Sequence, residues 1–179
     1  MSLELIIGCM YSGKSSELIR RVKQLQTIQQ PYVIYNSHID TRYGSQGVYT
    51  HNRNHLPSHI TDNLLNQIDS PEYQRAETVF IDEAQFFSDL YEFVKVSVET
   101  HNKQVVVIGL DGDSDRCNFG QIHQLVPLCD TITKLTALCS LCKDGTLGIF
   151  SKKIVNSSQT VDVGSTDKYM AVCRSCYLK

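Results

Sequence analysis

Short apolar runs alternate with amphipathic stretches along most of the chain. Four runs are rich in branched residues and have the length of buried parallel strands: residues 3–7, 32–35, 78–82 and 104–110. Residues 14–29 place apolar side chains at helical spacing, Pro31 marks the end of that helix, and residues 88–101 predict another. This alternation predicts an α/β fold with a doubly wound, mainly parallel sheet, whose ligands bind beyond the carboxyl ends of the strands.

Two stretches depart from this alternation. Residues 37–58 are polar, contain two glycines and predict a long loop. From Leu138 onward, paired cysteines, glycines and short β-prone pieces such as residues 160–163 replace the long apolar runs. We therefore expect two domains, an α/β domain over residues 1–136 and a small β lobe over residues 137–179.

Composition and charge exclude several classes of protein. The 179 residues carry a formal net charge of −2, which disfavours the large basic surface that nucleic acids need, so we expect no nucleic-acid partner. No apolar run approaches the roughly 18 residues of a membrane span, and no secretory signal follows Met1, so we expect no membrane partner and a cytoplasmic location. In the reducing cytosol, cysteine pairs hold metal more often than disulfides, and four of the seven cysteines form two Cys-x-x-Cys pairs.

Residues 8–15 read Gly-Cys-Met-Tyr-Ser-Gly-Lys-Ser and match the G-x-x-x-x-G-K-[ST] motif of a phosphate-binding P-loop. The motif lies between an expected strand and an expected helix, so its backbone N–H groups and the helix N-terminus can cradle phosphate. Lys14 would reach the β- and γ-phosphates of ATP, and the Ser15 hydroxyl would bind Mg²⁺. A glycine-rich turn without a ligand is the alternative. The nucleotide-binding residues that this motif predicts are Gly8, Met10, Tyr11, Ser12, Gly13, Lys14 and Ser15.

Two acidic residues, Asp82 and Glu83, stand where the strand predicted at residues 78–82 ends. Successive residues that leave a strand point in opposite directions, so one carboxylate can serve Mg²⁺ while the other faces a second substrate. Taken alone, the pair is a weak signal, and a solvated acidic turn is the alternative. The P-loop strengthens the first interpretation, because a bound nucleotide requires such a partner.

The two Cys-x-x-Cys pairs supply four thiolates: Cys139, Cys142, Cys173 and Cys176. This is the ligand set of a closed tetrahedral Zn²⁺ site, which leaves no position for water or substrate. Such an ion would be structural and would fasten a lobe that is too small to be ordered by its own core. The alternative is two reduced or disulfide-bonded pairs, since the stretch between them is longer than in a generic zinc ribbon.

Further sequence blocks follow the P-loop in a fixed order. They are Asp-Thr-Arg-Tyr at 40–43, Asp-Glu-Ala-Gln-Phe-Phe at 82–87, Leu-Asp-Gly at 110–112, Phe-Gly at 119–120, Lys-Leu-Thr-Ala at 134–137 and Asp-Lys-Tyr at 167–169. Together with the P-loop and the cysteine pairs, this series resembles the thymidine kinases of the small zinc-containing class. The resemblance covers nearly the whole chain, and the ordered set is far more specific than any one block.

The resemblance implies roles for the charged residues. Glu83 matches the family's general base, which takes the proton from the nucleoside 5′-hydroxyl. Asp82 would hold Mg²⁺ through water, and Asp40 would order metal-bound water. Arg42 matches a residue beside the transferred phosphoryl group, where it would stabilise charge together with Lys14; an exposed loop arginine is the alternative.

The same resemblance implies a thymine pocket. Its matching residues are Met10, Phe86, Leu110 and Phe119 along the lining and Tyr169, which closes it from the C-terminal lobe. Each of these could equally be a plain core residue. The base would lie under a lasso loop at about residues 143–168. Ser114 stands where family members carry an aromatic residue, which leaves the breadth of nucleoside specificity open.

The resemblance thus implies an ATP-dependent deoxynucleoside kinase with Mg²⁺ as the catalytic ion and Zn²⁺ as a structural ion. It would transfer the γ-phosphate of ATP to the 5′-hydroxyl of thymidine, and of deoxyuridine, in nucleotide salvage. The resemblance also implies a homotetramer. Two alternatives remain: a zinc-ribbon P-loop ATPase coupled to nucleic-acid binding, which the net charge disfavours, and a kinase with a different nucleoside or nucleotide as its preferred acceptor.

Overall fold

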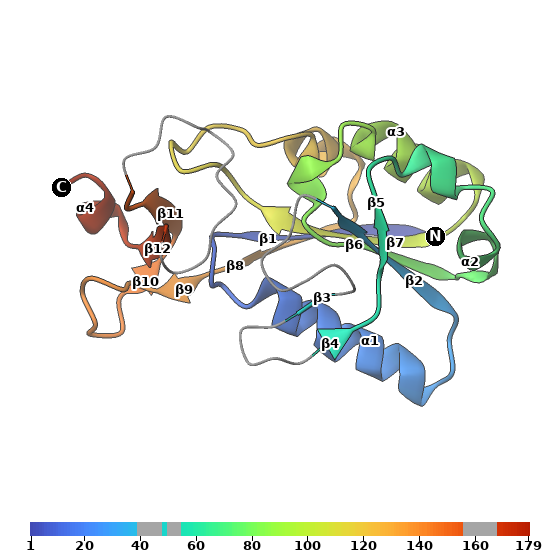
Figure 1. Cartoon of the computed structure of the whole chain (residues 1–179), viewed down its shortest axis with the longest axis horizontal. Coiled ribbons are helices and arrows are strands. Elements are labelled where there is room, and N and C mark those ends of the chain that lie inside the picture. Colours follow the sequence, from blue (N-terminus) through green and yellow to red (C-terminus); the bar gives the residue numbers. More distant parts are fainter. Residues whose placement is uncertain (39–47, 50–54, 156–167) are drawn as a thin grey trace.

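The computed structural model describes residues 1–38, 48–49, 55–155 and 168–179, and six of its strands form one central sheet (Figure 1). These strands are β1 (Ser2–Gly8), β2 (Tyr32–Ser37), β5 (His59–Thr61), β6 (Thr78–Ile81), β7 (Gln104–Leu110) and β8 (Thr131–Leu135). Their order across the sheet is β5-β2-β6-β7-β1-β8, and every neighbouring pair is parallel. The predicted α/β fold with a parallel sheet is confirmed.

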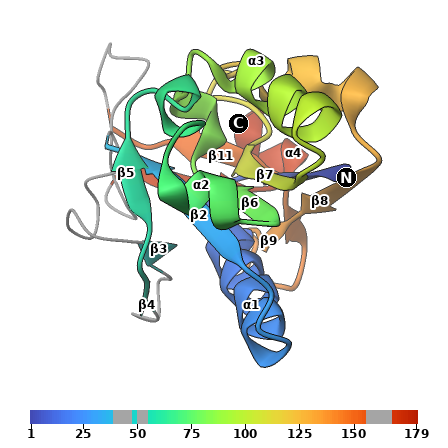
Figure 2. The same ribbon diagram turned by 90° about the vertical axis from the view of Figure 1, so that its right-hand side faces the viewer.

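Helices cover both faces of the sheet (Figure 2). On one face, the helix α1 (Lys14–Thr27) packs its buried Leu18 and Val22 near Ile6 and Phe80 of the sheet. The opposite face carries α2 (Pro71–Arg75), α3 (Leu90–Lys95), a π-helical turn (Val96–Thr100) and the 3₁₀ turns Leu65–Gln67, Ala84–Phe86 and Ile122–Leu128. Two hydrophobic cores flank the sheet, one on each face, and these elements enclose the larger of them. The sheet is therefore the middle one of three layers.

Two helices begin at positions that the sequence marks. Gly13 has φ 88° directly before α1, a left-handed conformation that glycine adopts without steric cost. Ser70 caps α2, because its hydroxyl accepts a hydrogen bond from the backbone N–H of Tyr73, and Pro71 takes the first helical position.

Within the described residues, no helix combines the length and the apolar character needed to cross a membrane.

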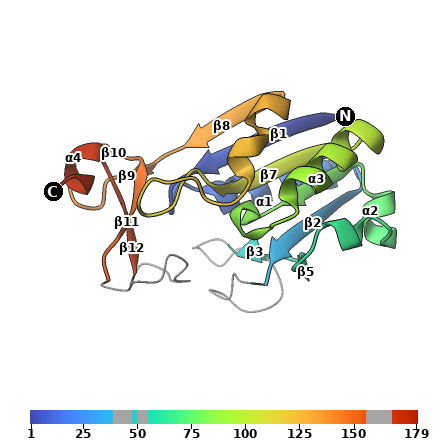
Figure 3. The same ribbon diagram turned by 90° about the horizontal axis from the view of Figure 1, so that it is seen from above.

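A small lobe follows β8 at the carboxyl edge of the sheet (Figure 3). It consists of β9 (Ala137–Leu138), β10 (Leu147–Gly148), β11 (Phe150–Lys153), β12 (Tyr169–Val172) and α4 (Arg174–Tyr177). β9 pairs antiparallel with β10, and β11 with β12. A separate short ribbon, β3 (Val48–Tyr49) with β4 (His55–Leu56), places Leu56 in the core on the α1 side of the sheet.

The sheet is wider than the apolar runs predicted. β5 and β8 were not predicted, because both are edge strands with largely exposed side chains and no continuous apolar run. β5 directly follows the stretch predicted as a loop at 37–58, and β3 and β4 lie within that stretch. The helix predicted at 88–101 is present as α3 and the π-helical turn, whereas the β-prone piece at 160–163 lies outside the described residues.

Candidate active site and metal centre

The glycine-rich loop of residues 8–15 joins β1 to α1. A side chain at Gly8 would collide with the backbone carbonyl of Leu135 on β8, so glycine permits the close approach of the two strands. The Ser12 hydroxyl is buried and has no hydrogen-bond partner among the described residues. The loop therefore offers a polar group that a phosphate oxygen could satisfy.

Lys14 is the first residue of α1, at the end of this loop, and its pKa is displaced. Its ammonium donates hydrogen bonds to the backbone carbonyls of Gly8 (3.1 Å) and Cys9 (2.7 Å). Burial lowers the pKa of Lys14, and the negative charges of Glu83 and Asp82 oppose that shift. The lysine that follows β1 is thus within electrostatic reach of both acids that follow β6, as predicted for groups at the carboxyl edge of one parallel sheet.

The two acids lie in a sharp turn. Asp82 is 4% exposed and Glu83 is 9% exposed, although both are charged residues. Glu83 adopts φ 48°, a left-handed conformation that ends the strand, and its backbone N–H donates to Asp82 Oδ1 at 3.0 Å. Two nearly buried carboxylates beside a lysine are not a solvated acidic turn, so that alternative is wrong.

Aromatic residues lie next to these acids. Phe86, at the end of the 3₁₀ turn that follows Glu83, meets Phe119 edge to face, with ring centroids 5.5 Å apart and planes at 88°. Leu110 ends β7 beside the same turn, because its backbone N–H donates to the side chain of Gln85 at 3.0 Å. The structure thus brings three of the predicted pocket residues to one region of the molecule.

Two further predicted pocket residues come from opposite sides of the junction between sheet and lobe. Met10 belongs to the glycine-rich loop, and its backbone N–H donates to the Ser151 hydroxyl of β11 at 2.9 Å. Tyr169 begins β12, is 9% exposed and pairs with Lys153 across the hairpin. Met10 therefore lies where the glycine-rich loop meets the lobe, and Tyr169 lies on β12 two residues before Ala171, the cross-strand partner of Ser151.

A cysteine cluster forms at the far end of the lobe. The four sulfur atoms of Cys139, Cys142, Cys173 and Cys176 all lie within 4.8 Å of one another, and no disulfide joins them. The Cys142 sulfur is 3.7 Å from that of Cys173 and 3.5 Å from that of Cys176. A tetrahedral zinc with Zn–S bonds of ~2.3 Å separates its sulfurs by ~3.8 Å, so the cluster has the dimensions of such a site.

The cysteine thiols of this cluster differ strongly in pKa. Burial alone would raise the pKa of Cys139, but backbone N–H groups of Cys142, Cys173 and Leu141 surround its sulfur and lower the pKa to about 6. The hydrogen bond with Cys176 raises the pKa of Cys142 to about 12. A divalent cation would replace the protons that the thiols share, and the donor set fits zinc.

Known proteins resemble the chain along almost its entire length. The family model described as thymidine kinase matches residues 1–177. The chain belongs to the thymidine kinase family. It is 40% identical to the thymidine kinase of raccoon poxvirus and 38% identical to that of vaccinia virus (strain Western Reserve), each over 177 residues, with 98% of this chain and 96% of the viral protein covered. It is 37% identical over 180 residues to a thymidine kinase of rice (Oryza sativa subsp. japonica), covering 98% of this chain and 66% of the rice protein.

Membership of the thymidine kinase family confirms the resemblance seen in the sequence motifs. Two predicted site residues, Asp40 and Arg42, lie outside the described residues, as do residues 156–167 of the segment predicted as the lasso at about 143–168; β10 and β11 lie in the described part of that segment. Gln85 received no role from the sequence motifs, although it lies within a recognised block. A glutamine two residues beyond a strand-end acid was the available signal, and its two hydrogen-bond partners appear only in the structure.

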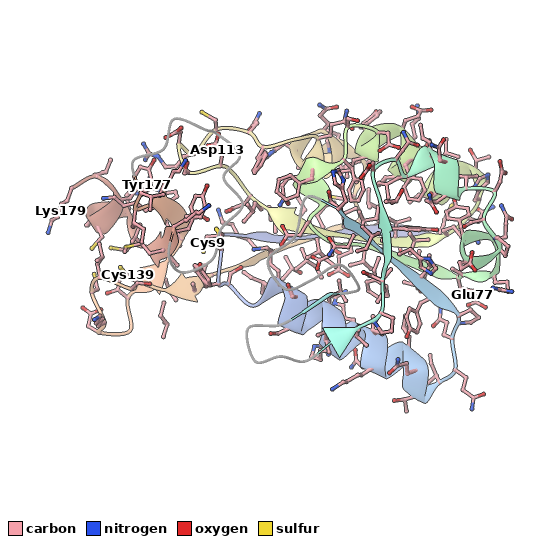
Figure 4. The ribbon with its side chains drawn as sticks, viewed as in Figure 1. Cys9, Glu77, Asp113, Cys139, Tyr177 and Lys179 are labelled. Atoms are coloured by element: carbon pink, nitrogen blue, oxygen red, sulfur yellow. The ribbon has the colours of Figure 1, made fainter. Side chains whose placement is uncertain are left out.

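The loop that follows β7 is attached to the lobe at Ser114, next to Asp113, which is labelled together with Tyr177 in Figure 4. The backbone carbonyl of Ser114 accepts a hydrogen bond of 2.7 Å from the Tyr177 hydroxyl. The guanidinium of Arg116 lies 4.4 Å from the ring centroid of Tyr177 and 5.5 Å from that of Phe150. Contacts with the lobe thus position this loop without an aromatic side chain at Ser114.

Proposed function

We propose that the chain is an ATP-dependent thymidine kinase, which transfers the γ-phosphoryl group of ATP to the 5′-hydroxyl of thymidine or deoxyuridine in nucleotide salvage. Family membership supports kinase activity on a nucleoside. The observation that carries the proposal is the meeting of Lys14, in a glycine-rich loop, with the nearly buried acids Asp82 and Glu83 at one edge of the sheet. This arrangement combines a phosphate site with a proton acceptor.

In the proposed reaction, the 5′-oxygen forms a bond to the γ-phosphorus as the bond from that phosphorus to the ADP oxygen breaks. Glu83 takes the proton that leaves the 5′-hydroxyl. Lys14 and Arg42 stabilise the negative charge on the phosphoryl oxygens. Ser15 and Asp82 would hold Mg²⁺, with Asp40 ordering its water.

When bound, Mg²⁺ would neutralise charge on the phosphates. The other groups of the glycine-rich loop would bind ATP, namely Gly8, Met10, Tyr11, Ser12 and Gly13. The buried hydroxyl of Ser12 supports this proposal, because it can donate to a phosphate oxygen.

The thymine base would bind between the sheet edge and the lobe. The proposed lining is Met10, Phe86, Leu110 and Phe119, with Tyr169 closing the pocket under a lasso formed by about residues 143–168. The edge-to-face contact of Phe86 and Phe119 supports an aromatic wall on one side. We further propose that purines are rejected, because a pocket sized for a methylated pyrimidine cannot admit the larger ring system.

The lobe of residues 137–179 would act as a zinc-stabilised domain beside the α/β domain of residues 1–136. Zinc bound by Cys139, Cys142, Cys173 and Cys176 would be structural, because all four ligands come from the protein. A homotetramer and a cytoplasmic location complete the proposal; the tetramer rests on the resemblance to the family, and the location rests on the sequence.

A panel of nucleosides tested with ATP and Mg²⁺ checks the substrate assignment. We expect thymidine to have the highest kcat/KM among the common deoxynucleosides. A higher kcat/KM for deoxyadenosine or deoxyguanosine would refute the pyrimidine pocket. ATP hydrolysis that is stimulated by DNA or RNA, in the absence of nucleoside phosphorylation, would instead identify an ATPase coupled to nucleic-acid binding.

Paired substitutions separate the roles of the two acids. Glu83→Gln keeps the size of the side chain but cannot accept a proton, so kcat should fall about 10²–10⁴-fold while ATP still binds. Asp82→Asn should instead change the dependence of the rate on Mg²⁺ concentration. Near-normal turnover of Glu83→Gln, combined with a collapse of Mg²⁺ affinity, would show that the two carboxylates have exchanged roles.

A further inference from the structure

Gln85 is a polar residue held inside the protein beside the proposed general base. Its side chain is 3% exposed. The amide Nε2 donates a hydrogen bond of 2.6 Å to Glu83 Oε2, and the amide Oε1 accepts one of 3.0 Å from the backbone N–H of Leu110 at the end of β7. One side chain therefore links the turn after β6 to the end of β7.

The direction of this amide is fixed by its partners. A backbone N–H can only donate, so the atom of Gln85 that faces Leu110 must be the carbonyl oxygen. The NH₂ group must then face Glu83, where a carboxylate can only accept. The amide consequently has no equivalent flipped orientation, and it presents a donor to one particular oxygen of the carboxylate.

Two glycines pack closely against Gln85. Gly109 in β7 lies so close that a Cβ there would stand 2.6 Å from Gln85 Oε1. Gly120 approaches from the other side, where a Cβ would overlap the backbone carbonyl of Gln85. Glycine at 109 thus lets β7 approach the Gln85 amide, and glycine at 120 lets its own segment approach the Gln85 backbone.

We propose that Gln85 is a positioning residue, which holds the Glu83 carboxylate in the orientation that receives the proton from the nucleoside 5′-hydroxyl. This role rests on the proposed kinase function. Fixing the unreactive oxygen of a carboxylate restricts its rotation, so that its other oxygen faces the substrate. A side chain anchored to β7 achieves this because the strand itself is part of the rigid sheet.

Gln85→Met tests the role, because methionine has a similar length but can neither donate to Glu83 nor accept from Leu110. We expect kcat for thymidine phosphorylation to fall about 10–100-fold, the scale on which misplacement by about 1 Å lowers rates. The KM values for ATP and thymidine should change by less than about threefold, since Gln85 contacts neither substrate in the proposal. Gln85→Asn is made in parallel, because its shorter amide cannot span both partners, and it should show the same loss of kcat.

Gln121 provides a matched control in the same part of the molecule. Its amide also joins two segments, since Nε2 donates to the Ser88 carbonyl at 2.6 Å and Oε1 accepts from the Tyr91 N–H at 2.9 Å. Gln121→Met removes an equivalent pair of hydrogen bonds, one donated and one accepted, at a position that does not contact Glu83 in this way. It should lower stability less than Gln85→Met does, because Gln121 is only half-buried, and it should retain kcat; an equal loss of kcat in both variants would overturn the positioning role.

A double-mutant cycle separates failure of this inference from failure of the proposed function. In the Glu83→Gln background, Gln85→Met should lower kcat no further, because both changes act through one carboxylate. If kcat is normal in Gln85→Met and Gln85→Asn but low in Glu83→Gln, then Gln85 has no positioning role and the kinase assignment stands. If the unchanged protein phosphorylates no nucleoside, both proposals are refuted.

Discussion

Gly120→Ala tests the tight packing behind the proposed general base. Gly120 has φ 63°, a left-handed conformation in which an alanine costs roughly 1–2 kcal/mol. The new Cβ would also stand 2.2 Å from the backbone oxygen of Gln85. Because normal C···O contacts are at least about 3.3 Å, Gln85 or Gly120 must move by about 1 Å. Overpacking of this kind typically costs about 1–3 kcal/mol, so we expect a total loss of about 2–5 kcal/mol in the free energy of unfolding.

Gly145→Ala is the control that isolates the collision. Gly145 has φ 91°, but nothing lies within 4 Å of the place that its Cβ would occupy, so its substitution carries the backbone strain alone, about 1–2 kcal/mol. Unfolding in urea gives both losses, and for a chain of this size each kcal/mol should also lower Tm by about 2–4 °C. The kcat should fall in Gly120→Ala, whereas Gly145→Ala is compared for stability alone, because Gly145 lies in the proposed lasso. Equal losses of stability would refute the argument that the contact with Gln85 is what requires glycine.

Two further predictions concern the metal centre and an ion pair on α1. Protein purified without chelator should contain one zinc per chain. Cys173→Ser should lose the metal and unfold more easily, whereas Cys117→Ser, at an exposed cysteine outside the cluster, should keep its zinc content and its stability. Equal zinc content in the two variants would contradict the site. Hydrogen bonds from Arg20 and Arg21 lower the pKa of Glu17 from 4.5 to about 2. The contacts of Glu17 with the two arginines therefore stabilise the protein fully above pH 4.5, and this contribution is lost as the pH falls toward 2. Glu17→Gln should therefore cost up to about 1 kcal/mol at pH 7 in urea unfolding, and a difference that persists at pH 2 would be inconsistent with this cause.

Buried and exposed strands differ in how far the sequence could predict them. β1, β6 and β7 are enclosed by helices on both faces, so each carries a mostly apolar run that fixes its position. β8 pairs with β1 along one side and keeps most of its side chains exposed, so its polar and apolar residues alternate without a clear run. The side chains of β5 are exposed in the same way, so no apolar run in the sequence indicated that strand. The missing information is the position of a strand in the sheet, which a single sequence does not encode locally.

The site shows a similar division. Residues in contiguous motifs could be assigned a proposed role from the sequence, because a strand, a glycine-rich loop and a helix fix the place of Lys14 without knowledge of the rest of the fold. Gln85 could not, because its proposed role depends on the backbone of Leu110, 25 residues away. Hydrogen bonds from side chains to distant backbone groups leave no pattern in composition or spacing.

The contacts between the lobe and the glycine-rich loop tie the two proposed substrate sites together. The backbone N–H of Met10 donates to Ser151, and the Cys9 thiol donates to the Gly148 carbonyl at 3.3 Å, so adjacent residues of the loop are bound to β11 and β10. Both strands lie between the cysteine pairs, and the hairpin partner of β11 leads directly to Cys173. A lobe this small has little core of its own, so order at the cysteine cluster should add, through these two hydrogen bonds, to the order that β1 and α1 already give the glycine-rich loop. The proposed zinc ion would then support ATP binding through the backbone, although none of its ligands belongs to the loop.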